Sequence, residues 1–351
     1  MKQFSHPLGQ LRQDPITDKW VAMATERSKR PDAETILKPT NIAPLPRYKD
    51  DCPFCNLAHY PQEPDVLRLP DDPHHWQVHM FANKYPAFKP SKEFHAWNEG
   101  PYRALDSVGY HDILATKYHN QDEALADRKL IALELEAIIL RYRQLQGELG
   151  VNYIQVIKNH GKEAGASVEH PHHQLFSIPV LPADIAELLH GTERFAKKHN
   201  EKAFTVILEY EKREKKRIVF ENEYFTAFCP FASRVPYETW IMPNTSNPFF
   251  ESIGPEEREA LAEALQQVLG KLYTGLNNPS YNYYIHSAPC DESGFVCDKS
   301  VFGHFRWHVS ILPRITTWAG FELGTGIEIN TVLPEDAAAF LREQHLPSQH
   351  S

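Results

Sequence analysis

The chain has 351 residues, of which 42% are hydrophobic and 24% are charged. This composition is typical of a soluble globular protein with a substantial core, and the length favours two domains or one duplicated fold. The formal net charge is −9, which argues against a nucleic-acid partner. The mixed-charge run 212–217 is interpreted as a solvated face, because such runs rarely form binding sites.

The sequence predicts a protein that does not enter a membrane. No segment approaches the roughly 20 apolar residues of a membrane span, and residues 1–13 lack the apolar core of a signal peptide. The five cysteines are Cys52, Cys55, Cys229, Cys290 and Cys297. An odd count with one close pair indicates a reducing compartment rather than a disulfide framework. We therefore expect a cytoplasmic protein.

Two long helices are predicted, at 128–149 and 255–276. In each, apolar residues recur at spacings of three and four. Gly150 provides a stop after the first helix, and Pro255 stands at the first turn of the second. β-Branched, aromatic or proline-terminated segments predict strands at 76–81, 151–157, 174–180, 224–229, 238–242, 281–285 and 307–312.

The two halves repeat one order of elements. Each has an aromatic strand, an X-Pro turn, a long helix, a strand, and a histidine-bearing strand that ends at Pro179 or Pro313. We interpret this order as a degenerate internal duplication, although a chance similarity between α+β segments would look the same. The expected fold is α+β, an antiparallel sheet or half-barrel with helices on one face, divided into 1–180 and 181–351.

A short histidine run is the strongest chemical signal. On a strand, His170, His172 and Gln174 project from one face, while Pro171 and His173 project from the other. The preceding segment 159–167 is rich in small residues and lets backbone N–H groups approach an anion. A partly neutral imidazole suits attack on phosphorus. The spacing alone is equally compatible with a metal-binding or surface cluster.

Cys52 and Cys55 form a C-x-x-C pair. Such a pair is half of a zinc site or a redox centre, and the proline- and aspartate-rich surroundings do not favour the redox centre. A closed zinc site needs two more ligands, for which His119 and His170 are the best candidates. The metal is then structural and ties the N-terminal loop to the strand of His172.

An ordered set of motifs resembles the galactose-1-phosphate uridylyltransferase family of the histidine-triad (HIT) superfamily over nearly the whole chain. Any one of these motifs is weak, but their order is specific. They are 14–21, 27–31, Cys52-x-x-Cys55, 81–86, Asn159-x-Gly161, the run 165–174, 221–225, 236–239, 285–289 and 319–322.

The resemblance implies a HIT-like fold in each half and specific roles for residues. His172 is implied as the nucleophile that forms a nucleotidyl-histidine, and Gln174 as the residue that holds the phosphoryl group. Glutamine there marks transfer, since hydrolases of the superfamily carry a third histidine. The implied zinc ligands are Cys52, Cys55, His119 and His170. The implied contacts to nucleotide, phosphates and sugar are Arg27, Arg30, Asn83, Asn159, Gly165, Ser167 and Glu322.

The family further implies a ping-pong enzyme and a homodimer whose site borrows residues from the partner. The leading hypothesis is UDP-glucose–hexose-1-phosphate (galactose-1-phosphate) uridylyltransferase, acting on a nucleotide sugar and a sugar 1-phosphate. The alternative is an ADP-glucose phosphorylase or adenylyltransferase of the same family, with phosphate as the acceptor in the phosphorylase. A third hypothesis, of another class, is a catalytically weak nucleotide sensor.

The chain departs from the family pattern at several positions. His173 replaces a glycine, Phe176 a tryptophan and Lys84 an acidic residue. We expect these changes to lie near the nucleotide, where they favour the phosphorylase branch.

A second metal site of the family is not expected here. Of its ligands only His286 and His308 remain, because Ser310 stands where a histidine is usual and Glu187 is displaced by one residue. We interpret the two histidines as satisfied structural residues, and Cys290 and Cys297 as buried thiols.

Overall fold

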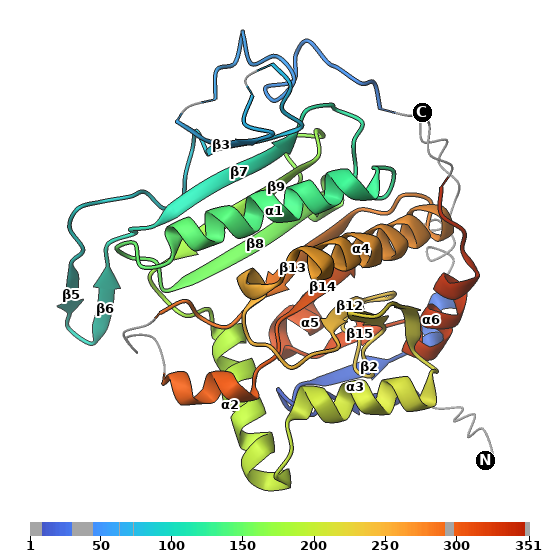
Figure 1. Cartoon of the computed structure of the whole chain (residues 1–351). Helices are drawn as coiled ribbons and strands as arrows, with labels where there is room; N and C mark the ends of the chain where they lie inside the picture. Colours follow the sequence, from blue (N-terminus) through green and yellow to red (C-terminus); the bar gives the residue numbers. More distant parts are fainter. Residues whose placement is uncertain (1–8, 30–44, 63, 73, 292–297, 348–351) are drawn as a thin grey trace.

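The computed structural model describes residues 9–29, 45–62, 64–72, 74–291 and 298–347. Figure 1 shows two long helices lying across a large sheet. The strands are β1 (Gln10–Gln13), β2 (Trp20–Met23), β3 (Asp65–Leu69), β4 (Val78–Ala82), β5 (Ala96–Glu99), β6 (Tyr102–Leu105), β7 (Tyr110–Thr116), β8 (Tyr153–His160), β9 (His172–Ile178), β10 (Ile218–Glu221), β11 (Phe225–Phe228), β12 (Thr239–Pro243), β13 (Tyr281–His286), β14 (His308–Pro313) and β15 (Glu328–Asn330). The helices are α1 (Arg128–Leu145), α2 (Ala183–His199), α3 (Ala203–Glu214), α4 (Pro255–Gly275), α5 (Gly320–Thr325) and α6 (Pro334–Glu343).

Ten strands form one antiparallel sheet in the order β10-β11-β12-β14-β13-β8-β9-β7-β4-β3. From the central pair β8 and β13 outward, the first half runs β8, β9, β7, β4, β3. The second half runs β13, β14, β12, β11, β10, which is the same topology. The predicted α+β class with a large antiparallel sheet is confirmed, and its strand order repeats. The boundary between residues 180 and 181 stays a prediction.

The pairing register makes positions in the two halves equivalent. Gln174 of β9 pairs with Ile157 of β8, and Ser310 of β14 pairs with Tyr284 of β13. Gln174 and Ser310 each lie two residues after the histidine that begins their strand. His308 therefore occupies in the second half the position that His172 occupies in the first.

Helices α1 and α4 cover one face of the sheet and lie side by side (Figure 1). Asp127 caps α1 by accepting a hydrogen bond from the N–H of Lys129, and the Glu257 carboxylate accepts from the N–H of Gly254 at the start of α4. Their apolar stripes meet inward-facing strand residues such as Val156 and Leu175 in the main core. Both predicted helices are present, and α1 ends four residues earlier than the predicted 149.

Helices α2 and α3 were not predicted, and they pack on the opposite face. Their apolar residues meet Phe228 and Met242 of the second half in a separate core cluster. The run 212–217 ends α3 and leads into β10. Its interpretation as a solvated face is wrong for Arg217, which is 4% exposed because it pairs with Glu211 and Glu335.

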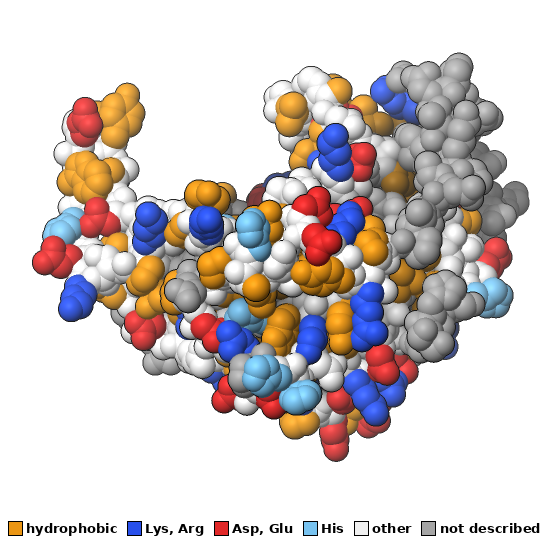
Figure 2. All heavy atoms as spheres, turned by 90° about the horizontal axis from the view of Figure 1, so that it is seen from above, with side chains coloured by type: hydrophobic (Ala, Val, Ile, Leu, Met, Phe, Trp, Pro, Cys, Tyr) orange, Lys and Arg blue, Asp and Glu red, His pale blue; other side chains and the backbone are white. Residues whose placement is uncertain are grey.

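Smaller elements surround the large sheet. Strands β1, β2 and β15 form a separate sheet, and β5 and β6 form a hairpin that projects as an arm at the left of Figures 1 and 2. Acidic and basic side chains are intermixed on the face seen in Figure 2. None of the helices within the described residues combines the length and the apolar character that crossing a bilayer requires.

Candidate active site

Four predicted zinc ligands meet at one point beside the start of β9. The Sγ atom of Cys55 lies 3.4 Å from Nδ1 of His119 and 3.3 Å from Nδ1 of His170, and Sγ of Cys52 lies 3.6 Å from Nδ1 of His170. All four ligand atoms lie within 4.8 Å of one another. A tetrahedral zinc with bonds of about 2.0–2.3 Å separates its ligand atoms by roughly 3.3–3.8 Å. The cluster is therefore consistent with a structural zinc site.

The surroundings of the cluster fix its histidines. Nε2 of His170 lies 2.8 Å from the carbonyl oxygen of Thr116, at the end of β7. This bond makes Nε2 the protonated nitrogen and leaves Nδ1 to face the sulfur atoms, as expected of a metal-ligating histidine. His119 follows β7 at a short distance, and the cysteines lie on the turn that precedes β3. The cluster thus joins the N-terminal loop to the sheet.

His172 is the first residue of β9 and is 6% exposed. Its Nδ1 lies 2.7 Å from the carbonyl oxygen of His170, so Nδ1 must donate and Nε2 keeps a lone pair. Burial lowers the pKa of His172 to about 4, against the opposing effect of this hydrogen bond. The ring is therefore neutral at pH 7. Phe54, between the two cysteines, contacts it edge-on with ring centroids 5.3 Å apart.

Gln174 lies in a chain of polar side chains that the sequence did not predict. Its Oε1 is 3.0 Å from Nε2 of His111 on β7, and that nitrogen is 3.1 Å from Nδ2 of Asn83. The His111 ring also stacks on Phe176, with centroids 3.9 Å apart. The structure thus brings Gln174 and Asn83 together through His111. His111 belongs to none of the motifs, and only its strand position opposite Phe176 could have indicated its place.

Asn159, on β8, is held by a residue of the second half. Nδ2 of Asn282 donates to Oδ1 of Asn159 and to the carbonyl oxygen of Ala164, both at 2.8 Å. Oδ1 of Asn159 is thereby occupied, and its amide N–H groups remain to meet an anion. Gly161 begins the small-residue loop at φ +80°, where a Cβ atom would lie 2.1 Å from Oγ of Ser280. Only glycine is accommodated there.

A pocket of about 410 Å³ lies over β8, β13 and β14. Asn159 and Asn282 line it together with two guanidinium groups, those of Arg234 and Arg314. Neither arginine was predicted as a site residue. The Nδ2 group of Asn159 and the two guanidinium groups are donors that suit the phosphates of a ligand. Ile157 of β8 lines this pocket and pairs with Gln174 of the adjacent strand β9. The pocket therefore begins one strand away from Gln174.

The other predicted contact residues lie on three further segments. Gly165 and Ser167 are exposed on the loop between β8 and β9. Arg27 is exposed on the 3₁₀ turn after β2, and Glu322 lies on α5, where its carboxylate accepts from the N–H of Ala319 at 2.9 Å. These two belong to the part of the chain around the small β1-β2-β15 sheet. Arg30 lies outside the described residues, so its placement stays a prediction.

His173 does not lie near the site, and the expectation that it does is wrong. Alternation along β9 turns it to the opposite face, beneath α1, where it is fully buried. Its Nε2 contacts the hydroxyl group of Tyr283 at 2.5 Å and lies 3.5 Å from Glu123. Lys158, its cross-strand neighbour, also pairs with Glu123, at 2.8 Å. The histidine replaces the family glycine within a buried polar network.

His286 and His308 lie together in the second half, with ring centroids 4.7 Å apart. Nδ1 of His308 lies 3.1 Å from the carbonyl oxygen of Arg306, which repeats the bond of His172. Nδ1 of His286 is buried without a hydrogen-bond partner among the described residues. The interpretation of His286 and His308 as satisfied structural residues is therefore wrong for His286.

The remaining residues considered for a second metal site lie elsewhere or are already paired. The Glu187 carboxylate is 2.6 Å from the ammonium group of Lys19, which neutralises its charge. Of the two cysteines that were interpreted as buried thiols, Cys290 is buried, as predicted, and Cys297 lies outside the described residues.

Comparisons with known proteins cover nearly the whole chain. The family described as "Galactose-1-phosphate uridyl transferase, N-terminal domain" matches residues 4–182, and a "Domain of unknown function (DUF4921)" matches residues 107–346. An ADP-glucose phosphorylase of Arabidopsis thaliana is 32% identical over 340 residues, which cover 96% of this chain and 93% of that protein. A galactose-1-phosphate uridylyltransferase of Thermotoga maritima is 32% identical over 344 residues, which cover 95% and 98%. The crystal structure of an Arabidopsis ADP-glucose phosphorylase with bound ADP-glucose is similar with a TM-score of 0.81 at 29% identity, over 97% of this chain and 100% of that one.

The fold, together with His170 and His172 at the entry to β9, defines a protein of the histidine-triad superfamily. Within that superfamily, the chain belongs to the family of galactose-1-phosphate uridylyltransferases and ADP-glucose phosphorylases, as the motifs predicted. It is an enzyme of this family, a nucleotidyltransferase or phosphorylase.

Proposed function

We propose that the protein transfers a nucleoside monophosphate from a nucleoside-diphosphate sugar to a sugar 1-phosphate through a covalent bond to Nε2 of His172. The expected reaction is that of a UDP-glucose–hexose-1-phosphate uridylyltransferase. One observation carries the proposal: the 2.7 Å bond from Nδ1 of His172 to the carbonyl oxygen of His170 leaves Nε2 as a neutral nucleophile. The same bond stabilises the positive charge that the ring gains on attack.

The chemistry takes two displacements. Nε2 of His172 attacks the α-phosphorus of the nucleotide sugar, a P–N bond forms, and the bond from that phosphorus to the bridging oxygen breaks. The leaving sugar 1-phosphate keeps the electron pair. An oxygen of a second sugar 1-phosphate then attacks the same phosphorus and releases Nε2. Both leaving groups are stable, so neither step requires proton donation, in agreement with glutamine rather than histidine at 174.

In this proposal Gln174 holds an oxygen of the transferred phosphoryl group, and His111 keeps Gln174 in place through their 3.0 Å contact. Asn159, oriented by Asn282, faces the departing phosphate. Cys52, Cys55, His119 and His170 would hold a zinc ion, which would supply a rigid anchor rather than a Lewis acid. With four protein ligands, no position on it would be open to substrate.

Phosphorolysis is the second candidate. With inorganic phosphate as the acceptor, the same nucleotidyl-His172 yields a nucleoside diphosphate, and adenine replaces uracil in the donor. The similarity to the ADP-glucose phosphorylase structure, with a TM-score of 0.81, favours this candidate. Both candidates share the first displacement and differ only in base and acceptor.

The test is a labelling experiment with UDP-glucose and ADP-glucose that carry radioactive phosphorus at the α-position. We expect one of them to leave label on the wild-type protein, and none on His172→Gly. Labelled protein is then given galactose 1-phosphate or phosphate. Formation of UDP-galactose supports the uridylyltransferase. Release of ADP from the labelled protein when phosphate is the only acceptor supports the phosphorylase. Tight nucleotide binding without any label would contradict the covalent mechanism and favour a sensor.

A second copy of the chain completes the site in our proposal. Arg27 and Glu322, which the family implies as substrate contacts, lie around the small sheet and not beside His172. If a partner subunit supplies them, inactive His172→Gly and Glu322→Ala chains will restore activity when mixed, because a heterodimer retains one intact site. Mixing after unfolding and refolding tests this, with each variant refolded alone as the control. No recovery would count against a shared site.

A further inference from the structure

The carboxylate of Glu123 is the centre of a buried polar network on the face of the sheet opposite His172. Glu123 lies between His119 and α1 and belongs to none of the sequence motifs. Its side chain is fully buried, and its partners Lys158 and Tyr283 are each 1% exposed. The network is therefore shielded from solvent, where hydrogen bonds to a charged group are strong.

The hydrogen bonds to Glu123 come from three strands. The ammonium group of Lys158, on β8, donates to Oε2 at 2.8 Å, and the hydroxyl group of Tyr283, on β13, donates to Oε1 at 2.8 Å. Because that hydroxyl proton is used, its oxygen accepts from Nε2 of His173, on β9. Burial alone would raise the pKa of Glu123, but the ammonium group of Lys158 lowers it below its ordinary value. The carboxylate is therefore charged at pH 7.

The three residues that Glu123 holds stand in one row across the sheet. Lys158 pairs with His173 on one side and with Tyr283 on the other. The next row on the same three strands contains His172, Asn159 and Asn282. Successive residues of a strand point to opposite faces, so the held row points toward α1 and the next row points toward the proposed site. Residues in the two rows share peptide groups, so a shift of one row displaces the other.

The segment that carries Glu123 is itself well ordered. Oδ1 of Asp122 accepts from the N–H of Ala124 at 3.1 Å, and the carbonyl oxygen of Asp122 accepts from the N–H of Ala126 at 2.7 Å. His119, a member of the cysteine–histidine cluster, lies shortly before this turn. Glu123 therefore ties the row to a fixed part of the backbone that also adjoins the cluster.

We propose that Glu123 is a positioning residue for the transfer reaction. By holding one row of the sheet from beneath, its carboxylate fixes the mutual placement of the three residues in the next row. This inference rests on the proposed function and adds to it a residue that acts through the strands, without contact with substrate.

The test is the rate at which a saturating nucleotide sugar labels His172 in a single turnover, measured well below the Tm of every variant. Glu123→Gln keeps the shape of the side chain and removes its charge. We expect the rate constant to fall by about tenfold to a hundredfold, because small displacements of reacting groups are costly. A wild-type rate in this variant would overturn the proposal.

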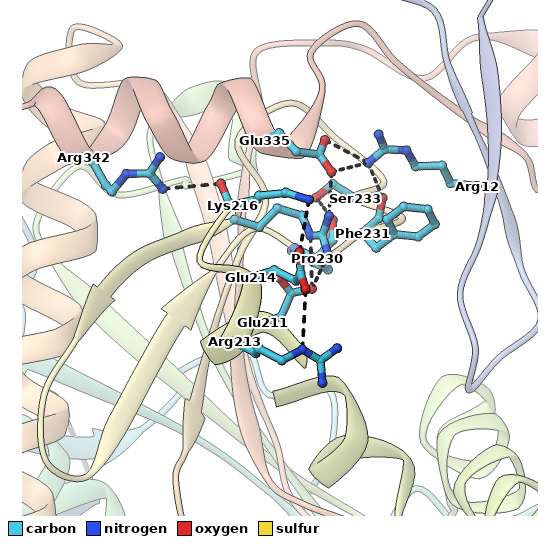
Figure 3. Close-up of polar contacts among 11 residues, drawn as sticks. Arg12, Glu211, Arg213, Glu214, Lys216, Pro230, Phe231, Ser233, Glu335 and Arg342 are labelled. Carbon is cyan, nitrogen blue, oxygen red and sulfur yellow. Dashed lines mark hydrogen bonds and ion pairs between the residues drawn. The ribbon is translucent and has the colours of Figure 1, made fainter. Parts of the chain in front are cut away.

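Glu211→Gln is the matched control. Glu211 is 2% exposed and pairs with Arg217, also at 2.8 Å, in a buried network of the second half (Figure 3). Glu211 lies on α3, and Arg217 directly precedes β10, so neither adjoins a residue of the proposed site. We expect this variant to lower Tm and to keep the labelling rate. An equal loss of rate in both variants would show a general effect of buried charge and overturn the proposal.

A double variant separates positioning from stability. Glu123→Gln/Lys158→Met removes the unpaired ammonium group, and an apolar replacement of a buried ion pair is often neutral for stability. We expect Tm to recover and the labelling rate to stay low, because β8 is no longer held. Recovery of the rate together with Tm would reduce Glu123 to a stabilising role. If Glu123→Gln does not fold, Tyr283→Phe removes the link to β13 and β9 and should lower the rate by about tenfold.

NMR gives a readout that needs no nucleotide. The Nδ1–H group of His172, which donates to the carbonyl oxygen of His170, should give a protected proton signal that is absent in His172→Gly. We expect this signal to shift and exchange faster in Glu123→Gln and to be unchanged in Glu211→Gln. This response in a protein that no nucleotide labels would contradict the transfer mechanism and support the positioning. An unchanged signal in Glu123→Gln would overturn the positioning whatever the reaction.

Discussion

Nδ1 of His172 lies 2.7 Å from the backbone carbonyl oxygen of His170, whose own side chain belongs to the cluster with Cys52, Cys55 and His119. The proposed nucleophile is therefore oriented by a residue of the proposed zinc cluster. Any movement of the cluster changes the direction in which Nε2 of His172 points. A zinc ion held by this cluster would therefore affect the rate, although its four protein ligands would leave no position open to substrate.

Removal of one zinc ligand is expected to lower both metal content and activity. Cys55→Ser should reduce bound zinc below one ion per chain and lower kcat by about tenfold or more, because the backbone at His170 is no longer held. Elemental analysis and steady-state kinetics measure the two quantities. Cys229→Ser is the matched control, since this buried thiol directly follows β11 and its Sγ lies 3.9 Å from Oγ1 of Thr239, outside the cluster. Full activity without zinc would contradict the anchoring role.

Loss of the His111 hydrogen bond is expected to impair catalysis through Gln174. His111→Phe keeps an aromatic ring on Phe176 but removes the contact to Oε1 of Gln174. We expect kcat to fall by about tenfold, the value of one hydrogen bond of roughly 1.4 kcal/mol. In a Gln174→Ala background the same change should have little further effect. Additive losses in this cycle would show that His111 acts by another route.

Asn282 is expected to affect substrate binding although it belongs to the second half. Asn282→Ala frees the side chain of Asn159, so the KM of the nucleotide sugar should rise by about tenfold and kcat should change less. The effect should nearly vanish in an Asn159→Ala background. Asn152→Ala provides the control, because it also loses one side-chain bond to a backbone carbonyl, at Pro179, on the same sheet. An equal rise in KM for both variants would indicate general loosening of the sheet.

A buried ion pair beneath the sheet predicts a pH dependence of stability. Burial alone would lower the pKa of His160, but the Asp122 carboxylate, 3.1 Å away, raises it above its ordinary value of 6.5. A raised pKa stabilises the folded state fully below pH 6.5, and this contribution is lost as the pH rises through the higher value. Wild type should therefore exceed His160→Gln in Tm at pH 6, by a margin that shrinks in alkaline buffer. His190→Gln, which removes an exposed histidine, is the matched control substitution.

The spacing of apolar residues along the sequence predicted those parts of the fold that depend on helical or strand periodicity alone. Helices α1 and α4 follow an apolar repeat with clear ends at Gly150 and Pro255, and alternation correctly placed His173 on the face opposite His172. Alternation could not predict which residues pack against that face. The expectation that His173 is near the nucleotide came from its place in a motif, whereas Glu123 and Tyr283, its actual neighbours, come from distant segments.

Other features depend on contacts that no local pattern records. Helices α2 and α3 are amphipathic, but the sequence of the first contains Gly191 and a run of charges ends the second. Gly191 lies in α2 because a Cβ atom there would approach within 2.1 Å of the carbonyl oxygen of Ile16. His111 and Asn282 each act on a motif residue from another strand, and only the register of the sheet brings them together.

The equivalence of His172 and His308 gives the molecule an internal reference. Both imidazoles donate from Nδ1 to the carbonyl oxygen two residues earlier, at 2.7 and 3.1 Å, and within the described residues a cluster of cysteines and histidines adjoins only the first. The same local backbone geometry thus occurs at both positions, with that cluster beside one of them. An NMR titration that resolves the two rings would separate what the backbone alone does to an imidazole from what the metal adds, under identical solvent and temperature.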